Sequence, residues 1–339
     1  GRRVIGIKMT SDPKAKEHER MRRAMDAIDR LQQRLAEVER APGESIAVMG
    51  MGCRFPGQVN SPESFWQLLE AARHGICKTP DDRWNSDHYL DSNPNTVGKI
   101  ITNQGGFLDR IREFDPGFFG ITPKETASMD PQHRLLLEVT WEAMEDAGMV
   151  PSSWAGKSVG VFIGISSHDY SRHLMKRPEE AIDAYLATGN AHSVAAGRLS
   201  YTYGFTGPSF VVDTACSSSL VAIHQACQSL RLGESNAAIV GAVNCLFSPE
   251  LSIAFSQARM LSPAGRCKTF DAHADGFVRA EGCGAVVLKR LSDAQAAGDP
   301  ILALIAGSAI NQDGSSGGLT VPNGPSQQSV IRQALKQAG

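Results

Sequence analysis

The sequence of 339 residues is short of several features that define particular classes of protein. It has no uninterrupted apolar run of the roughly 18 residues that a membrane-spanning helix requires, so no membrane span is expected. Its 34 basic side chains are balanced by 36 acidic ones, and no basic block is long enough to follow a phosphate backbone. Nucleic acid is therefore not an expected partner.

The cysteines show no pairing pattern. Seven occur, none in a C-x-x-C arrangement, and no group of His, Cys or carboxylate residues has the spacing of a zinc or iron site. An odd number of cysteines in a long chain without a secretory leader favours free thiols in a reducing compartment over a disulfide framework. We therefore expect a cytoplasmic protein that binds no metal.

Two glycine-containing stretches fall short of nucleotide-binding motifs. After Gly50-Met-Gly52, the dinucleotide-binding fingerprint would need a third glycine where Phe55 stands. Around Gly156-Lys157-Ser158, a P-loop would need a glycine where Pro151 stands. We therefore expect the chain to bind no nucleotide cofactor.

What the sequence does contain is an alternation of strand-like and helix-like segments. Hydrophobic residues make up 42% of the chain, enough for a large core. Helical spacing predicts helices over 130–144 and 220–231 and helices that begin near Phe65 and Ser326, whereas 81–106 has the composition of a polar loop. Short apolar runs predict strands at 46–50, 158–164, 210–212, 237–244, 283–289 and 301–305. This order predicts an α/β fold with short crossovers.

The chain is organised around Cys216, which lies where a predicted strand becomes a predicted helix. The positive end of a helix dipole stabilises a thiolate. The small neighbours Ala215 and 217–219 leave room for an acyl chain and for a backbone N–H that faces a developing oxyanion. This geometry favours a nucleophile, and an inert buried thiol is the alternative that it leaves open.

Three histidines can be weighed as partners of this thiol. His224 follows Cys216 by about two helical turns, which favours a packed or surface side chain over a base in contact with the sulfur. His273 stands in a polar turn and is expected to face solvent. The sequence gives His192 no role.

Several stretches occur in an order that is shared with one known family. They are Ile46-Ala-Val-Met-Gly-Met-Gly-Cys-Arg-Phe-Pro-Gly57, Met129-Asp-Pro-Gln132, Gly189-Asn190 with Ala195-Ala-Gly-Arg-Leu-Ser-Tyr201, Asp213-Thr-Ala-Cys-Ser-Ser-Ser219, Asp275-Gly-Phe-Val-Arg279 and Asn311-Gln-Asp-Gly314. Together they resemble the ketosynthase (β-ketoacyl synthase) domains of modular type I polyketide synthases. The resemblance runs from Ser45 to Gly339 and implies a further helix over 185–201.

The resemblance implies a thiolase-like fold and a defined chemistry. The implied ketosynthase domain covers 44–339, with its N-terminal half at 44–291 and the start of its C-terminal half at 300–339. In this family the cysteine at the position of Cys216 accepts an acyl chain from the phosphopantetheine of an acyl carrier protein. Decarboxylative Claisen condensation with a malonyl-type extender follows. Priming relatives carry Gln at this position, so Cys216 implies an elongating acyltransferase.

The same resemblance implies that the loop near Met129 lies at the interface of a homodimer and shapes the acyl pocket. The alternative is that Met129 only packs in the core. The resemblance gives the chain no bound cofactor of its own, because its substrates arrive on the carrier protein.

The N-terminal extension, residues 1–43, contains a heptad pattern. Its apolar residues fall at two heptad positions, Met21, Ile28 and Leu35 at one and Ala24, Leu31 and Val38 at the other. A helix this short and polar needs a partner helix, so the pattern predicts a coiled coil between two copies of the chain. In the family, such helices dock the preceding polyketide synthase subunit. A solvated helix that lies on its own domain is the alternative.

The family's two catalytic histidine motifs, His-Gly-Thr-Gly-Thr and Asn-x-Gly-His, do not occur in this sequence. The resemblance therefore implies that the C-terminal part of the domain is missing, and that condensation requires it. Two other functions stay open. One is an acyl-thioester enzyme of the same fold that acts without decarboxylation, and the other is a non-catalytic module for docking and dimerisation.

Overall fold

The computed structural model of the protein describes residues 18–29 and 43–339. The chain divides into two compact units, Gly1–Glu44 and Ser45–Gly339. In the first unit, residues 18–29 form a helix whose side chains are exposed. None of the helices in the described ranges has the length and apolar character needed to cross a bilayer.

The helix over residues 18–29 carries half of the predicted coiled-coil seam. Met21 and Ile28 expose 61% and 53% of their surface, and Ala24 is exposed as well. The remaining seam positions, Leu31, Leu35 and Val38, lie outside the described residues. The exposed apolar side chains agree with a seam that awaits a partner, and the coiled coil itself stays a prediction.

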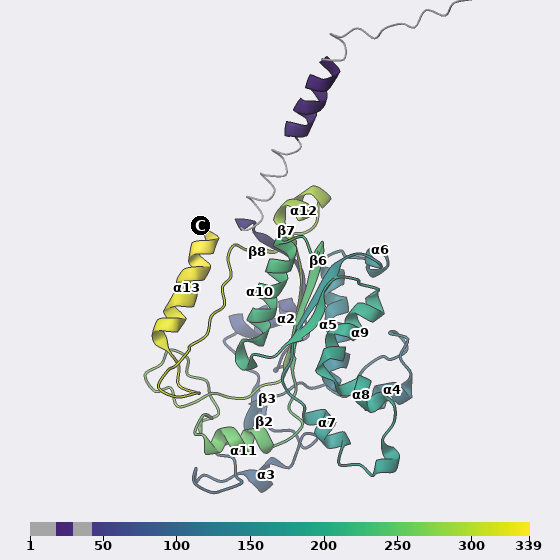
Figure 1. Ribbon diagram of the computed structural model, residues 1–339. Coiled ribbons are helices and arrows are strands. Elements are labelled where there is room, and N and C mark those ends of the chain that lie inside the picture. The colour runs from purple at the N-terminus through teal and green to yellow at the C-terminus, as the bar shows by residue number, and fades with distance from the viewer. Residues whose placement is uncertain (1–17, 30–42) are drawn as a thin grey trace, which may run out of the picture. The chain divides into compact units, whose positions relative to one another are not determined.

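Within residues 43–339, the second unit contains a six-stranded sheet, a two-stranded sheet and helices on both faces of the larger sheet (Figure 1). The strands are β1 Ile46–Arg54, β2 Ile76–Lys78, β3 Gln104–Gly106, β4 Val159–Gly164, β5 Ser209–Val212, β6 Ala237–Asn244, β7 Gly282–Arg290 and β8 Ala303–Ile305. The helices are α2 Pro62–Glu70, α3 Ser86–Tyr89, α4 Pro123–Ser128, α5 Pro131–Asp146, α6 Pro151–Trp154, α7 Asp169–Leu174, α8 Tyr185–Asn190, α9 His192–Tyr203, α10 Ser218–Arg231, α11 Glu250–Gln257, α12 Leu291–Ala297 and α13 Gly324–Ala338, with 3-10 helices η2 Glu179–Ala181 and η3 Ala215–Ser217. All six predicted strands are confirmed as members of the larger sheet.

The larger sheet is mixed, with the strand order β5-β4-β6-β7-β1-β8. Strand β4 pairs in parallel with β5 and with β6, so that Val161 lies opposite Ser209 on one side and Ile239 on the other. Strand β7 runs antiparallel to both β6 and β1, and β8 runs antiparallel to β1. The carboxyl ends of β4, β5 and β6 therefore share one edge of the sheet, which is where open α/β sheets bind ligands.

Alternate residues of the central strands supply two separate cores. Figure 1 shows α10 on one side of the sheet and α5 with α9 on the other. On the α5 side, Val161 and Ile163 of β4 pack in one cluster with fully buried leucines of α5. On the α10 side, Phe162 packs with Ala222, Ala226 and Leu230. Each fully buried Leu or Phe stabilises the fold by about 1.5–3 kcal/mol.

Strand β1 is longer than the sequence predicts. The predicted strand ends at residue 50, but the observed strand continues to Arg54 and pairs with β7 on both sides of a register shift between Val48 and Gly50. A Cβ atom on Gly50 would lie 2.4 Å from the carbonyl oxygen of Ala143, and one on Gly52 would lie 2.7 Å from that of Val139. These glycines therefore allow α5 to pack directly on the backbone of β1.

The helix predicted over 185–201 is interrupted. Ala191 has an extended conformation that ends α8 and begins α9. The interruption coincides with an attachment to the loop before α5, because Asn190 Nδ2 donates to the carbonyl of Ser128 at 2.8 Å and the Asp130 amide donates to the carbonyl of Gly189 at 2.9 Å. The Gly189 carbonyl thus accepts from the loop before α5 instead of from a residue of α9.

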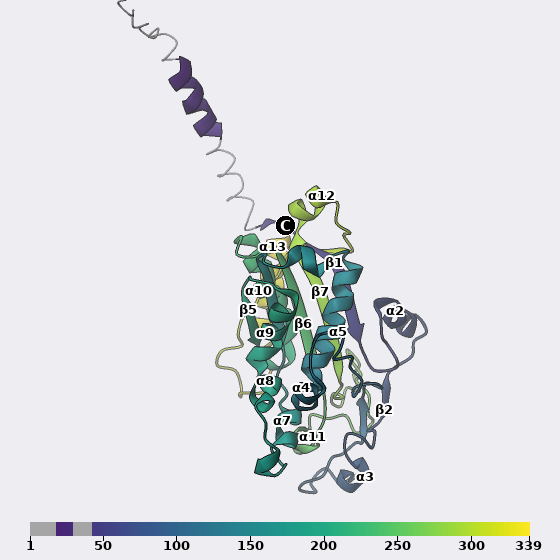
Figure 2. The same ribbon diagram turned by 90° about the vertical axis from the view of Figure 1, so that its right-hand side faces the viewer.

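The segment 81–106, predicted as a polar loop, contains short elements. Strand β3 pairs with β2, and α3 is a single turn capped by Asn85. Figure 2 shows these elements with α7 and α11 at one end of the molecule. Each is too short to produce a periodic sequence signal, which is why the sequence does not reveal them.

Candidate active site

Cys216 lies in the turn η3, between the end of β5 and the start of α10, and its side chain is exposed. Helix α10 begins two residues later, and no side chain caps its N-terminus. The turn η3 leads directly into the helix, so the Ser218 amide at the start of α10 donates to the carbonyl of Ala215. This is the strand-to-helix position that the sequence predicts.

The turn around Cys216 is held by short polar side chains. Ala215 adopts a positive φ of 55°, a conformation that costs a residue with a side chain about 1–3 kcal/mol. The Ala215 amide donates to Asp213 Oδ1 at 3.0 Å, and Ser218 Oγ donates to the carbonyl of Ala215 at 2.7 Å. The Thr214 amide donates to Ser218 Oγ at 2.9 Å. These bonds stabilise the sharp turn that presents the thiol at the surface.

The end of β4 lies directly against this turn. A Cβ atom on Gly164 would approach the Ser218 side chain and backbone to 3.1 Å. The absence of a side chain at Gly164 therefore lets the start of α10 pack against the neighbouring strand. At the edge formed by the carboxyl ends of β4, β5 and β6, Cys216 follows the end of β5, and the segment that follows β4 lies beside it.

Two histidines stack in this region. The rings of His168 and His192 are 3.7 Å apart and nearly parallel, with an angle of 5° between their planes. His192 Nε2 lies 3.1 Å from the carbonyl oxygen of Ser167, which identifies Nε2 as the protonated nitrogen. Burial lowers the pKa of His192, and the nearby Asp213 carboxylate opposes this shift. The structure therefore brings a neutral His192 towards the turn that carries Cys216.

The other two histidines behave as the sequence suggests. His224 Nδ1 lies 2.9 Å from Ser308 Oγ, and burial lowers the pKa of this histidine. His273 is exposed, and its Nδ1 lies 3.0 Å from Asp271 Oδ1. Neither contact involves Cys216.

A polar network joins the start of α5 to the strand ends. Asp130 caps α5 by accepting from the Gln132 amide at 2.8 Å, and Gln132 Nε2 donates to the carbonyl of Ser167 at 3.1 Å. Ser167 Oγ donates to Gln132 Oε1 at 2.9 Å. Burial raises the pKa of Asp130 to about 6. The sequence motif containing Gln132 thus positions the segment that follows β4, a function that the motif alone does not reveal.

Met129 precedes this network and is fully buried in the core on the α5 side. Its carbonyl oxygen accepts from Arg134 Nε at 3.0 Å and from Arg134 Nη2 at 2.6 Å. The side chain therefore packs within this chain. A role for Met129 in an acyl pocket or at a dimer interface stays a prediction.

The other cysteines differ from Cys216 in exposure or surroundings. Burial raises the pKa of Cys53 and of Cys227 to about 11 and raises those of Cys245 and Cys283 still further. Cys77 is exposed, but partial desolvation of its thiol raises its pKa as well. Cys267 is exposed and accepts from the Val278 amide through its sulfur at 3.3 Å. A high pKa leaves little reactive thiolate at neutral pH. Cys267 serves as the comparator for Cys216 because it is exposed and lies away from any helix start.

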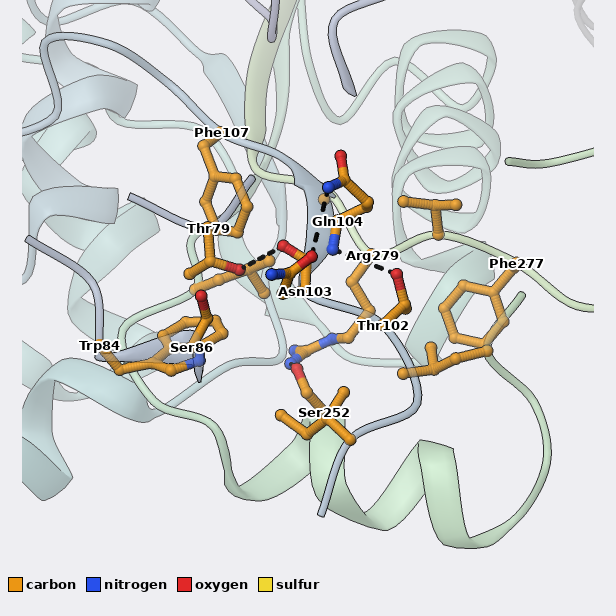
Figure 3. Close-up of a pocket in the computed structure, with 15 residues that line it drawn as sticks. Thr79, Trp84, Ser86, Thr102, Asn103, Gln104, Phe107, Ser252, Phe277 and Arg279 are labelled. Carbon is orange, nitrogen blue, oxygen red and sulfur yellow. Dashed lines mark hydrogen bonds between the residues drawn. The ribbon is translucent and has the colours of Figure 1, made fainter. Parts of the chain in front are cut away.

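Figure 3 shows a pocket that residues of β3 help to line. Thr79, Trp84, Asn103, Phe277 and Arg279 are among the residues that line it, and Arg279 Nη1 donates to Ser252 Oγ at 2.8 Å. Its volume of about 20 Å³ admits a water molecule or two, which is far less than an acyl chain needs. This pocket is therefore not a candidate substrate site.

No group of three or more His, Cys, Asp or Glu side chains in residues 18–29 and 43–339 is arranged to hold a metal ion.

Comparison with known families identifies the architecture. The family model described as "Beta-ketoacyl synthase, N-terminal domain" matches residues 43–294, and the one described as "Beta-ketoacyl synthase, C-terminal domain" matches residues 302–339. The chain belongs to the β-ketoacyl synthase family. The expected ketosynthase resemblance and thiolase-like fold are both confirmed.

Individual ketosynthase relatives are similar over most of this chain. It is 54% identical over 315 residues to a phenolphthiocerol/phthiocerol polyketide synthase subunit of Mycobacterium tuberculosis, and the match covers 92% of this chain and 14% of that protein. It is 53% identical over 296 residues to another phenolphthiocerol/phthiocerol polyketide synthase subunit of the same organism, and this match covers 87% of this chain and 19% of that protein.

Solved ketosynthase structures share the fold. The ketosynthase from module 6 of the bacillaene synthase of Bacillus subtilis 168 matches with a TM-score of 0.80 and 41% identity, over 87% of this chain and 49% of that one. An oxazolomycin ketosynthase domain from Streptomyces albus JA3453 matches with a TM-score of 0.82 and 35% identity, over 87% and 50%. The present chain thus spans about half of each solved ketosynthase and a small part of each polyketide synthase subunit.

Proposed function

We propose that Cys216 is the acyl-accepting nucleophile of this ketosynthase. The observation that carries the proposal is the exposed thiol on a turn with positive φ at the uncapped start of α10. The thiolate attacks the carbonyl carbon of an incoming acyl thioester and forms a new C–S bond. The carrier thiolate then leaves with the electron pair of the broken C–S bond and takes up a proton. A backbone N–H group of the turn around Cys216 stabilises the oxyanion between these steps.

The proposed acyl donor is the phosphopantetheine arm of an acyl carrier protein, and the proposed enzyme class is the acyltransferase. The family and the sequence relatives, which are polyketide synthase subunits, support both. A malonyl-type extender would then lose CO₂ by cleavage of its C–C bond. The resulting enolate carbon would attack the acyl carbonyl on Cys216, which would release the cysteine thiolate.

This second step needs donors that the present sequence does not supply. Decarboxylation builds negative charge on the thioester oxygen of the extender, and losing a single positioned donor typically costs about a hundredfold or more in rate. Both of the family's histidine motifs are missing from these 339 residues. We therefore expect acylation of the chain alone but no condensation.

The assembly is also a proposal. The ketosynthase domain would start near residue 44, form a homodimer, and receive an upstream polyketide synthase subunit through the N-terminal helix. The exposed Met21 and Ile28 support the helix contact. The seven free cysteines support a reducing, cytoplasmic setting.

The test is intact mass spectrometry after incubation with an acyl-pantetheine thioester. The expected result is one acyl group per chain, which is lost when Cys216 is replaced by Ala and kept when Cys267 is replaced by Ala. An unmodified chain would support the non-catalytic docking module instead. Release of free acid from the thioester would support the hydrolytic alternative, and malonyl-dependent CO₂ release would show that the chain alone can decarboxylate.

A further inference from the structure

A groove of about 610 Å³ lies on the α5 side of the molecule, among the end of β1, residues 108–119 and the C-terminal half of α5. None of the residues 213–218 lines it. Helix α10, which follows Cys216, packs on the other face of the sheet. The groove is therefore separate from the candidate active site.

The groove has an aromatic wall. Phe118 is 54% exposed, and its ring meets that of Trp141 edge-on with a centroid distance of 4.8 Å. Phe114 and Phe119 stack beside them at 5.3 Å. Exposed aromatic faces offer apolar contact area and attract cations, and Trp attracts them most strongly.

The rim of the groove is acidic. Five carboxylates and two guanidinium groups line it, which leaves an excess of three negative charges. The carboxylates are those of Asp109, Glu113, Asp115, Glu138 and Glu142, and the guanidinium groups are those of Arg54 and Arg110. Both arginines are already paired, Arg54 with Glu142 at 2.6 Å and Arg110 with Glu113 at 2.7 Å. The other three carboxylates form no ion pair with any residue of 43–339.

Glu138 is the central one of these carboxylates. It lies on α5 and is partly buried, with Trp141 one turn further along the helix. Burial is the main cause that raises its pKa, and Arg54 opposes the shift. The Asp115 amide also hydrogen-bonds to it. Because Arg54 is already paired with Glu142, the partly buried Glu138 carboxylate still gains from a further cation that reaches it.

We propose that this groove is a docking site for a basic peptide segment with an aromatic anchor. The anchor would pack against Phe118 and Trp141, and an arginine or lysine of the segment would pair with Glu138. The aromatic wall and the unpaired carboxylates carry the inference together, because peptide-binding grooves combine an apolar anchor site with complementary charge. The excess negative charge disfavours anionic ligands such as the phosphopantetheine arm.

The test uses the full 339-residue chain and a fluorescein-labelled nonapeptide with three arginines around one tryptophan. Fluorescence anisotropy should show saturable binding that weakens as salt is added. Two control peptides separate the contributions, one with glutamate in place of each arginine and one with alanine in place of tryptophan. We expect no binding by the first and about tenfold weaker binding by the second.

Protein variants locate the site. Glu138→Gln should weaken binding about fivefold and reduce its salt dependence, and Phe118→Ala should weaken it about tenfold. Glu145→Gln removes a carboxylate from the same helix outside the groove and should leave binding unchanged. Unfolding midpoints show that each variant keeps its fold.

Two outcomes would overturn the proposal. If Glu138→Gln and Glu145→Gln weakened peptide binding equally, the binding would be unspecific charge attraction and not docking in the groove. Binding that is unaffected by Phe118→Ala and by loss of the peptide tryptophan would show that the aromatic wall takes no part. Neither result bears on the acylation of Cys216, so the two proposals fail independently.

Discussion

Arg83 and Glu281, separated by 198 positions in the sequence, form a buried bidentate ion pair with distances of 2.8 and 2.9 Å. The Glu281 carboxylate also accepts from the backbone amides of Leu108 at 2.8 Å and of Leu246 at 3.1 Å. The Glu281 side chain thus connects three segments, which contain Arg83, Leu108 and Leu246. The short elements that cover this end of the molecule are attached to the sheet through this carboxylate.

Removing one partner of this pair should destabilise the protein strongly. Arg83→Met leaves the buried Glu281 carboxylate without its cation, and Glu281→Gln leaves Arg83 with only the less buried Asp82, so each should cost about 3–5 kcal/mol of unfolding free energy. Urea denaturation followed by circular dichroism measures this loss. Asp87→Asn, which breaks the exposed pair with Lys78, serves as control and should leave the midpoint unchanged. A midpoint for Glu281→Gln equal to that of the control would contradict the role given to this pair.

Cys216 should be the cysteine most rapidly alkylated by iodoacetamide at pH 8. The four buried cysteines are inaccessible and have raised pKa values, about 11 for Cys53 and for Cys227, so their thiolate fraction at this pH is on the order of 0.1%. Peptide mapping over a time course gives the rate at each site. Equal rates at Cys216 and Cys267 would show that exposure alone, without the helix terminus, governs reactivity.

Asp130 should make stability depend on pH in a defined direction. Its folded pKa of about 6 lies above the ordinary value of 3.8, so the folded state holds the proton more tightly than the unfolded state. The resulting stabilisation is fully present below pH 4 and is lost as the pH rises through 6. Asp130→Asn keeps a capping oxygen, so its stability relative to the native protein should rise by roughly 2 kcal/mol between pH 4 and pH 7. Denaturant titrations at several pH values test this, and a constant difference would contradict the assignment.

The coiled-coil prediction can be tested by cross-linking in the full chain. With Cys77, Cys216 and Cys267 replaced by Ser, the Ile28→Cys variant should form a disulfide between two chains under mild oxidation, because seam positions face each other. The Asp26→Cys variant, altered on the opposite side of the heptad, should cross-link at least tenfold more slowly. Non-reducing gel electrophoresis quantifies both. Equal cross-linking of the two variants would exclude a parallel seam.

The sequence predicts a strand most clearly where every residue of that strand is buried. Val161, Phe162 and Ile163 are buried on both faces of the sheet, so their apolar run identifies β4 without further information. The position of Cys216 could be predicted in the same way, because an apolar run marks the strand before it and helical spacing marks the helix after it. For these elements, the hydrophobic pattern of a short sequence window was sufficient to predict the structure.

Tertiary contacts account for what the sequence did not reveal. The strand predicted over 46–50 stops short of Gly52, whose place in β1 becomes clear only from the packing of α5. The stacking of His168 on His192 joins two helix starts with no shared spacing in the sequence. The pair of Arg83 and Glu281 likewise depends on the closed fold. In each case the cause is a residue far away in the chain, which no local window contains.

The strand order has a consequence for the way the chain folds. Strands β4, β5 and β6 and helix α10 form a contiguous part of the sequence that can assemble early. Strand β1 instead pairs with β7 and β8, so that Ile46 must find Arg290 and Ile305. Loops of this length close slowly, and the ribosome must synthesise residues 55–281 before the first strand gains either neighbour in the sheet. Strand β1 can thus join the sheet only after β7 has been synthesised, and until then its apolar residues must be kept from other chains.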